Sequence, residues 1–236
     1  MSDSVVQRVH TLPWDTIEER LNQDGYALTP TLLLEEECTR LVKSYDDDTL
    51  FRSRVVMARF GFGRGEYKYF NNPLPEIVAE FRRELYPRLA PVANRWASQI
   101  GGDSYPEKYG AFLKKCHAAG QTKPTPLLLR YEVGDFNCLH QDLYGELAFP
   151  FQLTFFLSRP DVDYSGGEFV LVEQRPRMQS RATVIMAEQG QAIIFPTRYR
   201  AVRGTRGTYK TSLRHGVSPL RSGHRFTLGI IFHDAK

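Results

Sequence analysis

The chain has 236 residues, 42% of them hydrophobic, so it can bury the core of one ordinary domain, expected to span residues 1–236. No apolar run is long enough to cross a membrane, and residues 1–11 lack an apolar signal segment, so we expect neither a membrane partner nor secretion. The net charge is +4, and three cysteines without a Cys-x-x-Cys pair (Cys38, Cys116 and Cys138) favour a reducing compartment, by default the cytoplasm.

Apolar residues recur at helical spacing in four stretches of the first half of the chain. These stretches are 14–21, 34–45, 77–85 and 109–116, and the third is expected to stop at Pro87 and Pro91. His10 is assigned to an N-terminal tail. Residues 1–124 are therefore predicted to be a mainly helical support that also carries one hairpin.

That hairpin is predicted at 51–70, a segment dense in arginine, glycine and aromatic residues. Its pattern indicates a strand, a flexible glycine-rich loop at 61–65 and a return strand. We expect it to lie near a substrate and to contact it through Arg52, Arg54, Tyr67 and Tyr69. The alternative is a hairpin whose aromatic residues pack on the helices and whose arginines are solvated.

From residue 125 the hydrophobic period changes to two, which is typical of strands. Strands are expected at 126–133, 137–142, 149–157, 168–173, 191–195, 211–217 and 225–232. Seven short strands at roughly even spacing predict a jelly roll of two sheets over 125–236. The expected class is α+β: a cupin-like double-stranded β-helix braced by the N-terminal helices.

A candidate metal site begins at His140-Gln141-Asp142, the only His-x-Asp triplet of the chain. Residues two apart on a strand leave the same face, so His140 and Asp142 can bind one ion while Gln141 points away. His215, on a later strand, is expected to be the third ligand. Two histidines and one carboxylate are the ligands of non-haem Fe(II) oxygenases, in which they leave coordination positions open.

The other histidines have ordinary expected positions. His117 is expected to end a helix and His233 to lie at the C-terminal fringe. His224 is the only rival for the distal ligand, but on a strand it would face away from its neighbour Arg225.

Arg225 makes the metal-site interpretation more specific, because a permanent cation suits the far carboxylate of 2-oxoglutarate. Arg225 and Thr227 share one face of the last predicted strand, so Thr227 can add a hydroxyl group. Tyr131 could donate its phenol to the same co-substrate, or it could be a core aromatic residue with a satisfied hydroxyl. The sequence therefore predicts a dioxygenase that uses Fe(II), 2-oxoglutarate and O2.

Two sets of motifs resemble known dioxygenases. Arg130-Tyr131, Gly134 and then Leu139-His140-Gln141-Asp142 resemble the AlkB-type enzymes, which repair alkylated nucleic acids. Downstream, the chain is similar to the prolyl-hydroxylase branch at Gly166-Gly167-Glu168, Gly190, Ile193-Ile194-Phe195, His215-Gly216-Val217 and Gly223-His224-Arg225. Residues 206–234 look like one bacterial subfamily described as nucleic-acid-modifying 2-oxoglutarate oxygenases, whose members are often labelled proline hydroxylases.

The resemblance covers most of the chain and implies the same residues: His140, Asp142 and His215 for iron, Arg225 for 2-oxoglutarate, and Tyr131 beside it. One position departs from it. Leu129 stands where AlkB-type enzymes usually place an asparagine that contacts the co-substrate, which argues against close kinship with them.

The charge pattern bears on the substrate. Residues 1–50 carry eleven acidic and four basic side chains, whereas 175–225 carry eleven basic ones against Glu188 alone. This basic segment could attract phosphates or an acidic surface, or it could be a solvated face neutralised by the acidic N-terminal helices.

Three functions stay open at this point. The first is oxidative demethylation of nucleic acid, with the 51–70 hairpin stacking on an extruded base. The second is hydroxylation of a protein residue or amino acid, and the third is a jelly-roll binding module without catalysis. The sequence indicates no oligomeric state.

Overall fold

The computed structural model describes residues 4–142, 145–205 and 207–236. Its helices are α1 (Val5–His10), α2 (Trp14–Asp24), α3 (Glu35–Ser44), α4 (Glu76–Ile100) and α5 (Tyr109–Ala118), with 3-10 turns at Asp48–Leu50 and Met57–Phe60. Its strands are β1 (Ala27–Leu28), β2 (Phe51–Val56), β3 (Gly63–Arg64), β4 (Glu66–Phe70), β5 (Leu127–Tyr131), β6 (Phe136–His140), β7 (Phe151–Phe156), β8 (Tyr164–Gly166), β9 (Phe169–Gln174), β10 (Arg181–Ile185), β11 (Ala192–Pro196), β12 (Tyr199–Gly204), β13 (Gly207–Val217), β14 (Leu220–Gly223) and β15 (Arg225–Ile231).

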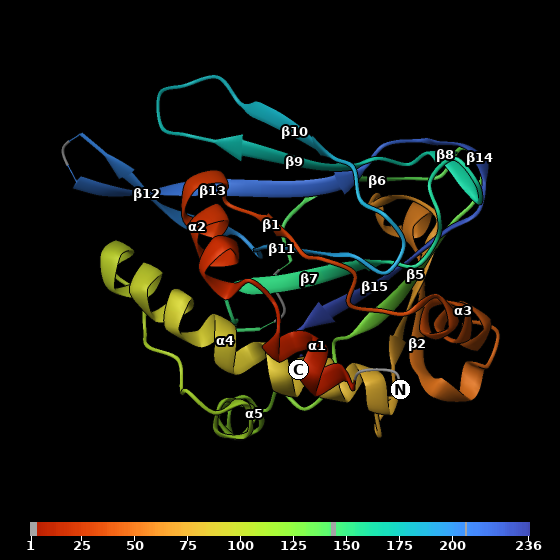
Figure 1. The fold of residues 1–236 in the computed structure, drawn as a ribbon, viewed down its shortest axis with the longest axis horizontal. Helices are drawn as coiled ribbons and strands as arrows, with labels where there is room; N and C mark the ends of the chain where they lie inside the picture. The colour runs from red at the N-terminus through yellow and green to blue at the C-terminus, as the bar shows by residue number, and fades with distance from the viewer. Residues whose placement is uncertain (1–3, 143–144, 206) are drawn as a thin grey trace.

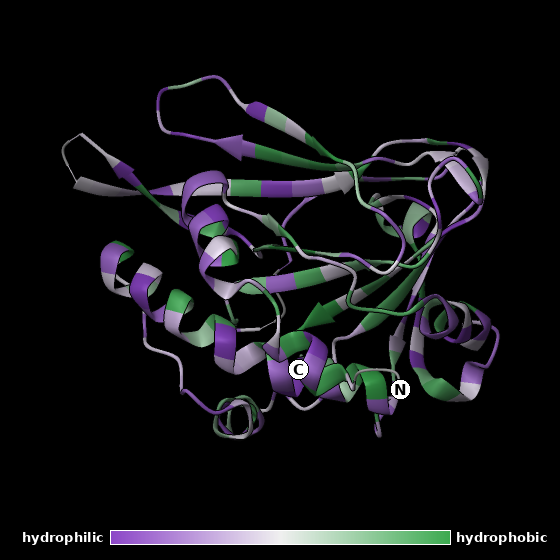
Figure 2. Ribbon diagram, in the orientation of Figure 1, coloured by the Kyte–Doolittle hydropathy of each residue, from purple (hydrophilic) through white to green (hydrophobic). Residues whose placement is uncertain are grey.

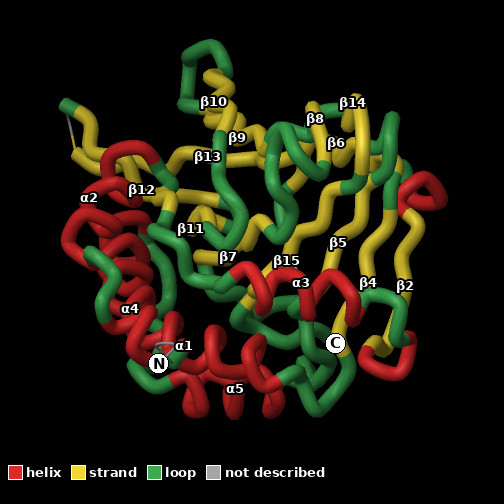
Figure 3. The backbone as a smooth tube through the Cα atoms, turned by 45° about the vertical axis from the view of Figure 1, so that its right-hand side comes forward, coloured by secondary structure: helices red, strands yellow, loops and turns green. Residues whose placement is uncertain are grey.

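Two antiparallel sheets lie above a layer of helices (Figure 1). The seven-stranded sheet has the order β1-β11-β7-β15-β5-β4-β2. The six-stranded sheet has the order β10-β9-β13-β6-β3, with β12 paired to β13. Figure 3 shows the helices gathered on the outer side of the seven-stranded sheet, which leaves its inner side for the site. The predicted double-stranded β-helix braced by helices is thereby confirmed.

The core forms where apolar faces of strands and helices meet, and Figure 2 shows hydrophobic positions concentrated on strands and inward helix turns. One large cluster joins all five helices to the seven-stranded sheet. A smaller one joins the two sheets through Phe156, Phe169, Leu171, Ile193 and Phe195. No helix within the described residues is long and apolar enough to cross a membrane.

The assignment of His10 to a tail is wrong, because the residue ends helix α1. Ser4 caps this helix: its hydroxyl accepts from the Gln7 amide at 3.3 Å, and the Gln7 side chain accepts from the Ser4 amide at 3.1 Å. Val5 and Val9 are buried against the core. Six residues make less than two helical turns, so the sequence showed too little periodicity to reveal the helix.

The predicted interruption at Pro87 and Pro91 is also wrong, because helix α4 runs through both residues. The two prolines are four residues apart, so they share one face of the helix, and both are exposed. The carbonyl groups that lose a partner to proline therefore face water. The opposite face buries Phe81, Leu85 and Leu89.

The hairpin at 51–70 forms as predicted at its two strands, β2 and β4, which pair at the edge of the seven-stranded sheet. Its glycine-rich segment is not a free loop, because β3 pairs with β6 of the other sheet. Gly63 has φ +126°, and a Cβ there would lie 2.3 Å from the Phe136 carbonyl oxygen. Only glycine fits this crossing, which ties the two sheets together beside the predicted metal site.

All seven predicted jelly-roll strands are present, but six others were missed: β1, β3, β8, β10, β12 and β14. The strand expected at 211–217 begins at Gly207 and forms a hairpin with β12. Another hairpin joins β9 to β10. Both extend beyond the sandwich (Figures 1 and 3). Their outer ends pack on little, so they lack the apolar alternation from which strands were predicted.

Candidate metal centre

Strand pairing brings the two predicted histidine ligands together. His140 ends β6 and His215 lies near the end of β13, and their Cα atoms are direct cross-strand partners. Their ring centroids are 4.1 Å apart. Residues opposite one another on neighbouring strands share a face, so both imidazoles enter the space between the sheets.

Asp142 follows β6 by two residues and completes the group. Its carboxylate oxygens lie 3.5 Å from His140 Nε2 and 3.2 Å from His215 Nε2. The Asp142 amide donates to the Thr197 carbonyl at 3.3 Å, and the Gln141 side chain donates to Ser212 Oγ at 2.9 Å. These bonds fix the turn, so Gln141 points outward while Asp142 points into the site.

The electrostatics give Asp142 and His215 the forms that bind a metal, whereas His140 must lose a proton when the metal binds. Burial opposes ionisation of Asp142, but the charge of His215 and hydrogen bonds from both histidines hold its pKa well below the usual value. Burial and then the charge of His140 lower the pKa of His215. Burial also lowers the pKa of His140, but the hydrogen bond and charge of Asp142 outweigh burial, so the pKa of His140 is raised. An ionised carboxylate and a neutral imidazole are what a divalent ion requires.

The donor atoms fit an iron ion. One donor atom from each of His140, Asp142 and His215 can be chosen so that all lie within 4.8 Å of one another, and no other such cluster occurs among the described residues. His140 Nδ1 lies 2.8 Å from the Cys138 carbonyl oxygen. Donation to this carbonyl places the ring proton on Nδ1 and leaves Nε2 free as a ligand. Two imidazoles and one carboxylate match non-haem Fe(II) and leave positions open.

His224 does not belong to this group. It is exposed, and it lines a different surface hollow together with Glu35 and Arg159. The other three histidines of the chain are likewise absent from the cluster.

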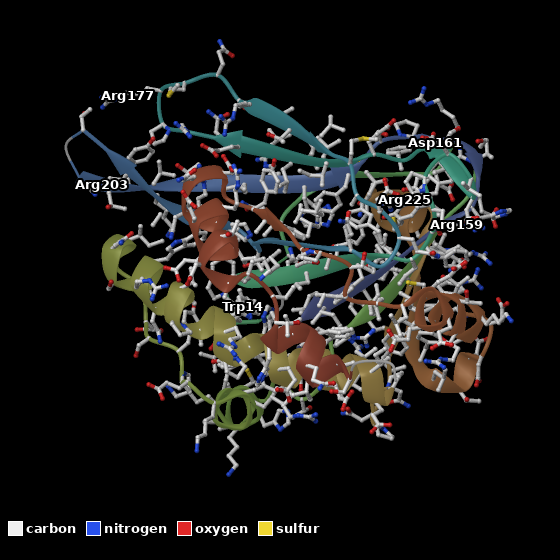
Figure 4. The ribbon with its side chains drawn as sticks, viewed as in Figure 1. Trp14, Arg159, Asp161, Arg177, Arg203 and Arg225 are labelled. Atoms are coloured by element: carbon white, nitrogen blue, oxygen red, sulfur yellow. The ribbon has the colours of Figure 1, made fainter. Side chains whose placement is uncertain are left out.

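A cavity between the sheets connects the three side chains to Arg225. It encloses about 540 Å³ of empty space, including its open mouth. Arg225 is 1% exposed, and none of its three guanidinium nitrogens has a hydrogen-bond partner among the described residues. Figure 4 places it inside the sandwich. A buried cation without a partner is costly, so this cavity fits an anionic ligand.

Tyr131 and Thr227 lie where the sequence predicted them. Tyr131 is the cross-strand partner of Arg225, and Thr227 lies two residues further along β15; both line the cavity. Burial raises the pKa of Tyr131 to about 12, so its hydroxyl keeps its proton and can donate. Asn137 Nδ2 donates to this hydroxyl at 3.5 Å.

Sequence reasoning missed other residues of the cavity, chiefly Asn137, Gln152 and Phe169. Gln152 is buried on β7, and its side-chain nitrogen has no partner among the described residues, so it is a second free donor. A lone glutamine in the apolar run Phe151-Gln152-Leu153 was the signal that could have revealed it. Leu129, the position that departs from the AlkB pattern, also lines the cavity.

The four residues expected to contact the substrate divide between two faces of the sheet. Tyr67 lines the cavity, and its ring lies 5.3 Å from that of Tyr69. Arg52 lies over the Tyr69 ring at 4.5 Å and donates to a backbone carbonyl at 2.9 Å. Arg54 instead pairs with Glu66 on the opposite face. The geometry thus brings Tyr67 to the cavity, whereas Tyr69 and Arg52 lie next to Tyr67 but outside the cavity lining.

Comparisons with known proteins agree with this geometry. Residues 65–235 match the family model Oxygenase-NA, described as "Oxygenase, catalysing oxidative methylation of damaged DNA". Two Mycobacterium tuberculosis proteins, the uncharacterized protein MT2286 (strain CDC 1551 / Oshkosh) and the uncharacterized protein Rv2227 (strain ATCC 25618 / H37Rv), are each 49% identical over 167 residues. These cover 70% of this chain and 72% of each relative.

Solved structures share the fold. A Trichoplax adhaerens prolyl hydroxylase in complex with a hypoxia inducible factor peptide has a TM-score of 0.58 at 14% identity, covering 97% of this chain and 91% of that chain. A Pseudomonas putida prolyl-4-hydroxylase has a TM-score of 0.55 at 13% identity, covering 94% and 99%. A Burkholderia pseudomallei 2OG-Fe(II) oxygenase has a TM-score of 0.52 at 14% identity, covering 94% and 92%.

Proposed function

Because the chain belongs to the Oxygenase-NA family, we propose that it is an Fe(II)- and 2-oxoglutarate-dependent dioxygenase that demethylates nucleic acid by oxidation. The observation that carries the proposal is the unpartnered, buried Arg225 in the same cavity as the His140, Asp142 and His215 cluster. A structural arginine at this depth would be paired with a carboxylate. An arginine that holds the far carboxylate of a co-substrate has no partner until the co-substrate binds.

His140, Asp142 and His215 would hold the iron. When bound, iron and 2-oxoglutarate supply the oxidising chemistry, in which O2 and 2-oxoglutarate give succinate, CO2 and an oxygen atom for a substrate C–H bond. The short hydrogen bond from His140 Nδ1 to the Cys138 carbonyl would hold the ring oriented with Nε2 toward the metal. The buried Asp142 carboxylate stays ionised and balances part of the metal charge.

Arg225 would bind the co-substrate carboxylate through two parallel hydrogen bonds, which its planar guanidinium group favours. Tyr131 stands opposite it and would add a neutral donor, and Thr227 would add a hydroxyl. The Tyr131, Phe156 and Tyr164 rings lie 5.5, 5.6 and 5.8 Å from the guanidinium carbon. These rings exclude water, so each charged hydrogen bond is stronger than it would be at the surface.

Two features support nucleic acid as the substrate: the family description and the excess of basic residues at 175–225. Hydroxylation of an N-methyl carbon gives an N-hydroxymethyl group, whose C–N bond breaks to release formaldehyde and restore the N–H. Tyr67 and Tyr69 would contact the base beside the cavity, where aromatic rings suit stacking. Hydroxylation of a protein residue is the competing outcome of the test below.

The test is a screen of N-methylated oligonucleotides against peptides, each incubated with the protein, Fe(II), 2-oxoglutarate and O2 and scored by product mass. The proposal predicts a loss of about 14 mass units (CH2) per methyl group removed, together with one equivalent of succinate, as expected for a cofactor-driven oxidation. A gain of one oxygen on a peptide, with the oligonucleotides unchanged, would assign the protein-hydroxylase function instead.

A further inference from the structure

The basic segment at 175–225 divides into paired and unpaired side chains. Arg175, Arg181 and Arg200 all pair with Glu173, and Arg221 pairs with Glu168. Five exposed or partly exposed cations make no ion pair with any described residue: Arg177, Arg198, Arg203, Lys210 and Arg214. Arg206 lies outside the described residues.

The acidic N-terminal helices do not neutralise these cations. Within the part of the chain that the structure describes, the N-terminal carboxylates pair elsewhere: Glu37 with Arg8, Asp48 with Lys68, and Glu18 with Arg95. The expectation of a face balanced by those helices therefore has no support from the ion pairs that the structure contains. The five cations keep their charge available for a partner.

Four residues of the β12–β13 hairpin share one face, which we call the arm face: Tyr199, Arg203, Lys210 and Arg214. In the register of this hairpin Tyr199 is opposite Ser212, and Arg203 is opposite Thr208. Since opposite residues share a face and alternate residues along β13 do too, all four side chains emerge together. Arg177 lies in the turn of the neighbouring β9–β10 hairpin, and Figure 4 places Arg177 and Arg203 at the two tips.

The base of the arm face lies on the strand that carries His215, although Arg214 and His215 leave opposite faces of that strand. At its base, Arg198 and Lys210 lie 4.4 and 4.1 Å from the Tyr199 ring, beside a groove that also contains Thr197. Thr197 is the residue whose carbonyl accepts from the Asp142 amide. The groove and the metal site are therefore linked by one backbone hydrogen bond, although their linings share no residue.

The length of the arm gives the reach of this surface. Seven residues separate Thr208, opposite Arg203, from His215 on the same strand. At roughly 3.3 Å per residue the arm face extends about 23 Å from the metal centre. Phosphates of one strand of a duplex recur about every 3.4 Å along its axis, so this span covers at most about seven nucleotides.

We propose that the arm face binds the phosphate backbone of the nucleic-acid substrate, over at most about seven nucleotides. This inference rests on the proposed function and adds where the polymer lies. Unpaired cations in line, with an aromatic ring between two of them, match the chemistry of a single strand, whose phosphates and bases alternate. Nucleic acid is favoured over an acidic peptide, because the charges of a nucleic-acid strand recur at regular intervals along the whole strand.

The experiment compares two triple variants that remove equal charge. The arm variant is Arg203→Gln, Lys210→Gln, Arg214→Gln, and the control is Lys108→Gln, Lys114→Gln, Lys115→Gln at and near helix α5, where all three lysines are exposed. Fluorescence anisotropy measures binding of a labelled 15-nucleotide single strand and of a 4-nucleotide strand, both carrying an N-methylated base, across a series of salt concentrations. Both variants should melt at the wild-type temperature.

For the 15-nucleotide strand, the arm variant should bind at least tenfold more weakly than wild type. Its slope of log affinity against log salt should fall by about 2, since each lost phosphate contact removes about 0.7. The control should stay within about twofold, and the arm variant should lose less affinity for the 4-nucleotide strand, which can reach only the base of the arm. An Arg203→Lys, Arg214→Lys variant should bind like wild type, because charge is what the backbone recognises.

Two failures are distinguishable. If wild type binds the long strand and the arm variant matches the control, the arm inference is wrong and the proposed function is unaffected. If wild type binds neither strand but binds a polyglutamate peptide in an arm-dependent way, the arm recognises an acidic peptide, and both the inference and the proposed function are wrong.

Discussion

Arg225 on β15 and Tyr131 on β5 are direct cross-strand partners, and the guanidinium carbon of Arg225 lies 5.5 Å from the centroid of the Tyr131 ring. The pair places a buried cation and a buried phenol on one wall of the cavity whose other wall carries His140 and His215. The candidate anion site thus faces the candidate metal site.

Replacing Arg225 by methionine should separate binding from stability. We expect the apparent affinity for 2-oxoglutarate to fall tenfold or more, because a charge-assisted hydrogen bond is worth about 1.5–3 kcal/mol. The free energy of unfolding of the ligand-free protein should not fall, since an unpartnered buried charge is removed. Calorimetric titration and urea unfolding measure the two quantities. An unchanged affinity would place the co-substrate elsewhere, and a marked loss of stability would make Arg225 structural.

Tyr131→Phe removes one neutral donor and keeps the ring. One such hydrogen bond contributes about 1 kcal/mol, so the apparent affinity for 2-oxoglutarate should fall about fivefold. Thr227→Val offers a matched change on the opposing strand, and its effect should not exceed this. If titration shows no effect of Tyr131→Phe, the phenol is only a core residue.

Metal binding should depend on three side chains and no fourth. Asp142→Ala and His215→Ala should each abolish stoichiometric Fe(II) binding under anaerobic conditions, because two remaining ligands hold the ion weakly. His224→Ala, at the exposed histidine outside the cluster, is the control and should bind one equivalent of iron. Metal analysis after gel filtration gives the stoichiometry. Retention of iron by Asp142→Ala would refute the ligand set.

His233 should weaken the fold in acid. Burial, followed by the charge of Arg82, lowers its pKa to about 4, and its Nδ1 accepts from the Phe149 amide at 3.1 Å. Between the unfolded value of 6.5 and about 4, the unfolded chain binds the proton and the folded chain does not. The free energy of unfolding should therefore decrease as the pH falls through this window, by about 3 kcal/mol from this residue.

His233→Asn is the matched variant, because its side-chain oxygen can accept the same Phe149 hydrogen bond without titrating. Urea unfolding of the metal-free proteins at pH 7 and pH 4 should show that the variant loses about 3 kcal/mol less than wild type over this interval. Equal losses in the two proteins would remove His233 as the cause.

Much of the site could be predicted from the sequence, because its signals are local. The spacing of His140 and Asp142 places both on one side of the chain, and the Arg225–Thr227 spacing does the same on β15. The pairing of His140 with His215 could not be derived, since it joins residues 75 positions apart through sheet register. Nor could the sequence distinguish Arg54, paired with Glu66, from Arg52, which lies over the Tyr69 ring on the cavity side.

The fold, like the site, could be predicted from the sequence only in part. The long periodic stretches were identified, whereas α1 was too short to show its period and the exposed prolines of α4 did not break its hydrogen bonding where it is buried. Strand β10 was missed because most of it is exposed, and β12 because its buried residues Arg200, Ala201 and Val202 are consecutive and do not alternate with exposed ones. The hairpin strands that lack a regular apolar alternation are thus the ones with surfaces available to a binding partner.

The most direct test of the account is an anaerobic crystal structure of the protein with Fe(II) and 2-oxoglutarate. It should show one iron bonded to His140, Asp142 and His215, with the far carboxylate of 2-oxoglutarate paired to Arg225 next to Tyr131. An iron bound through other side chains, or a 2-oxoglutarate whose far carboxylate lies away from Arg225, would contradict it.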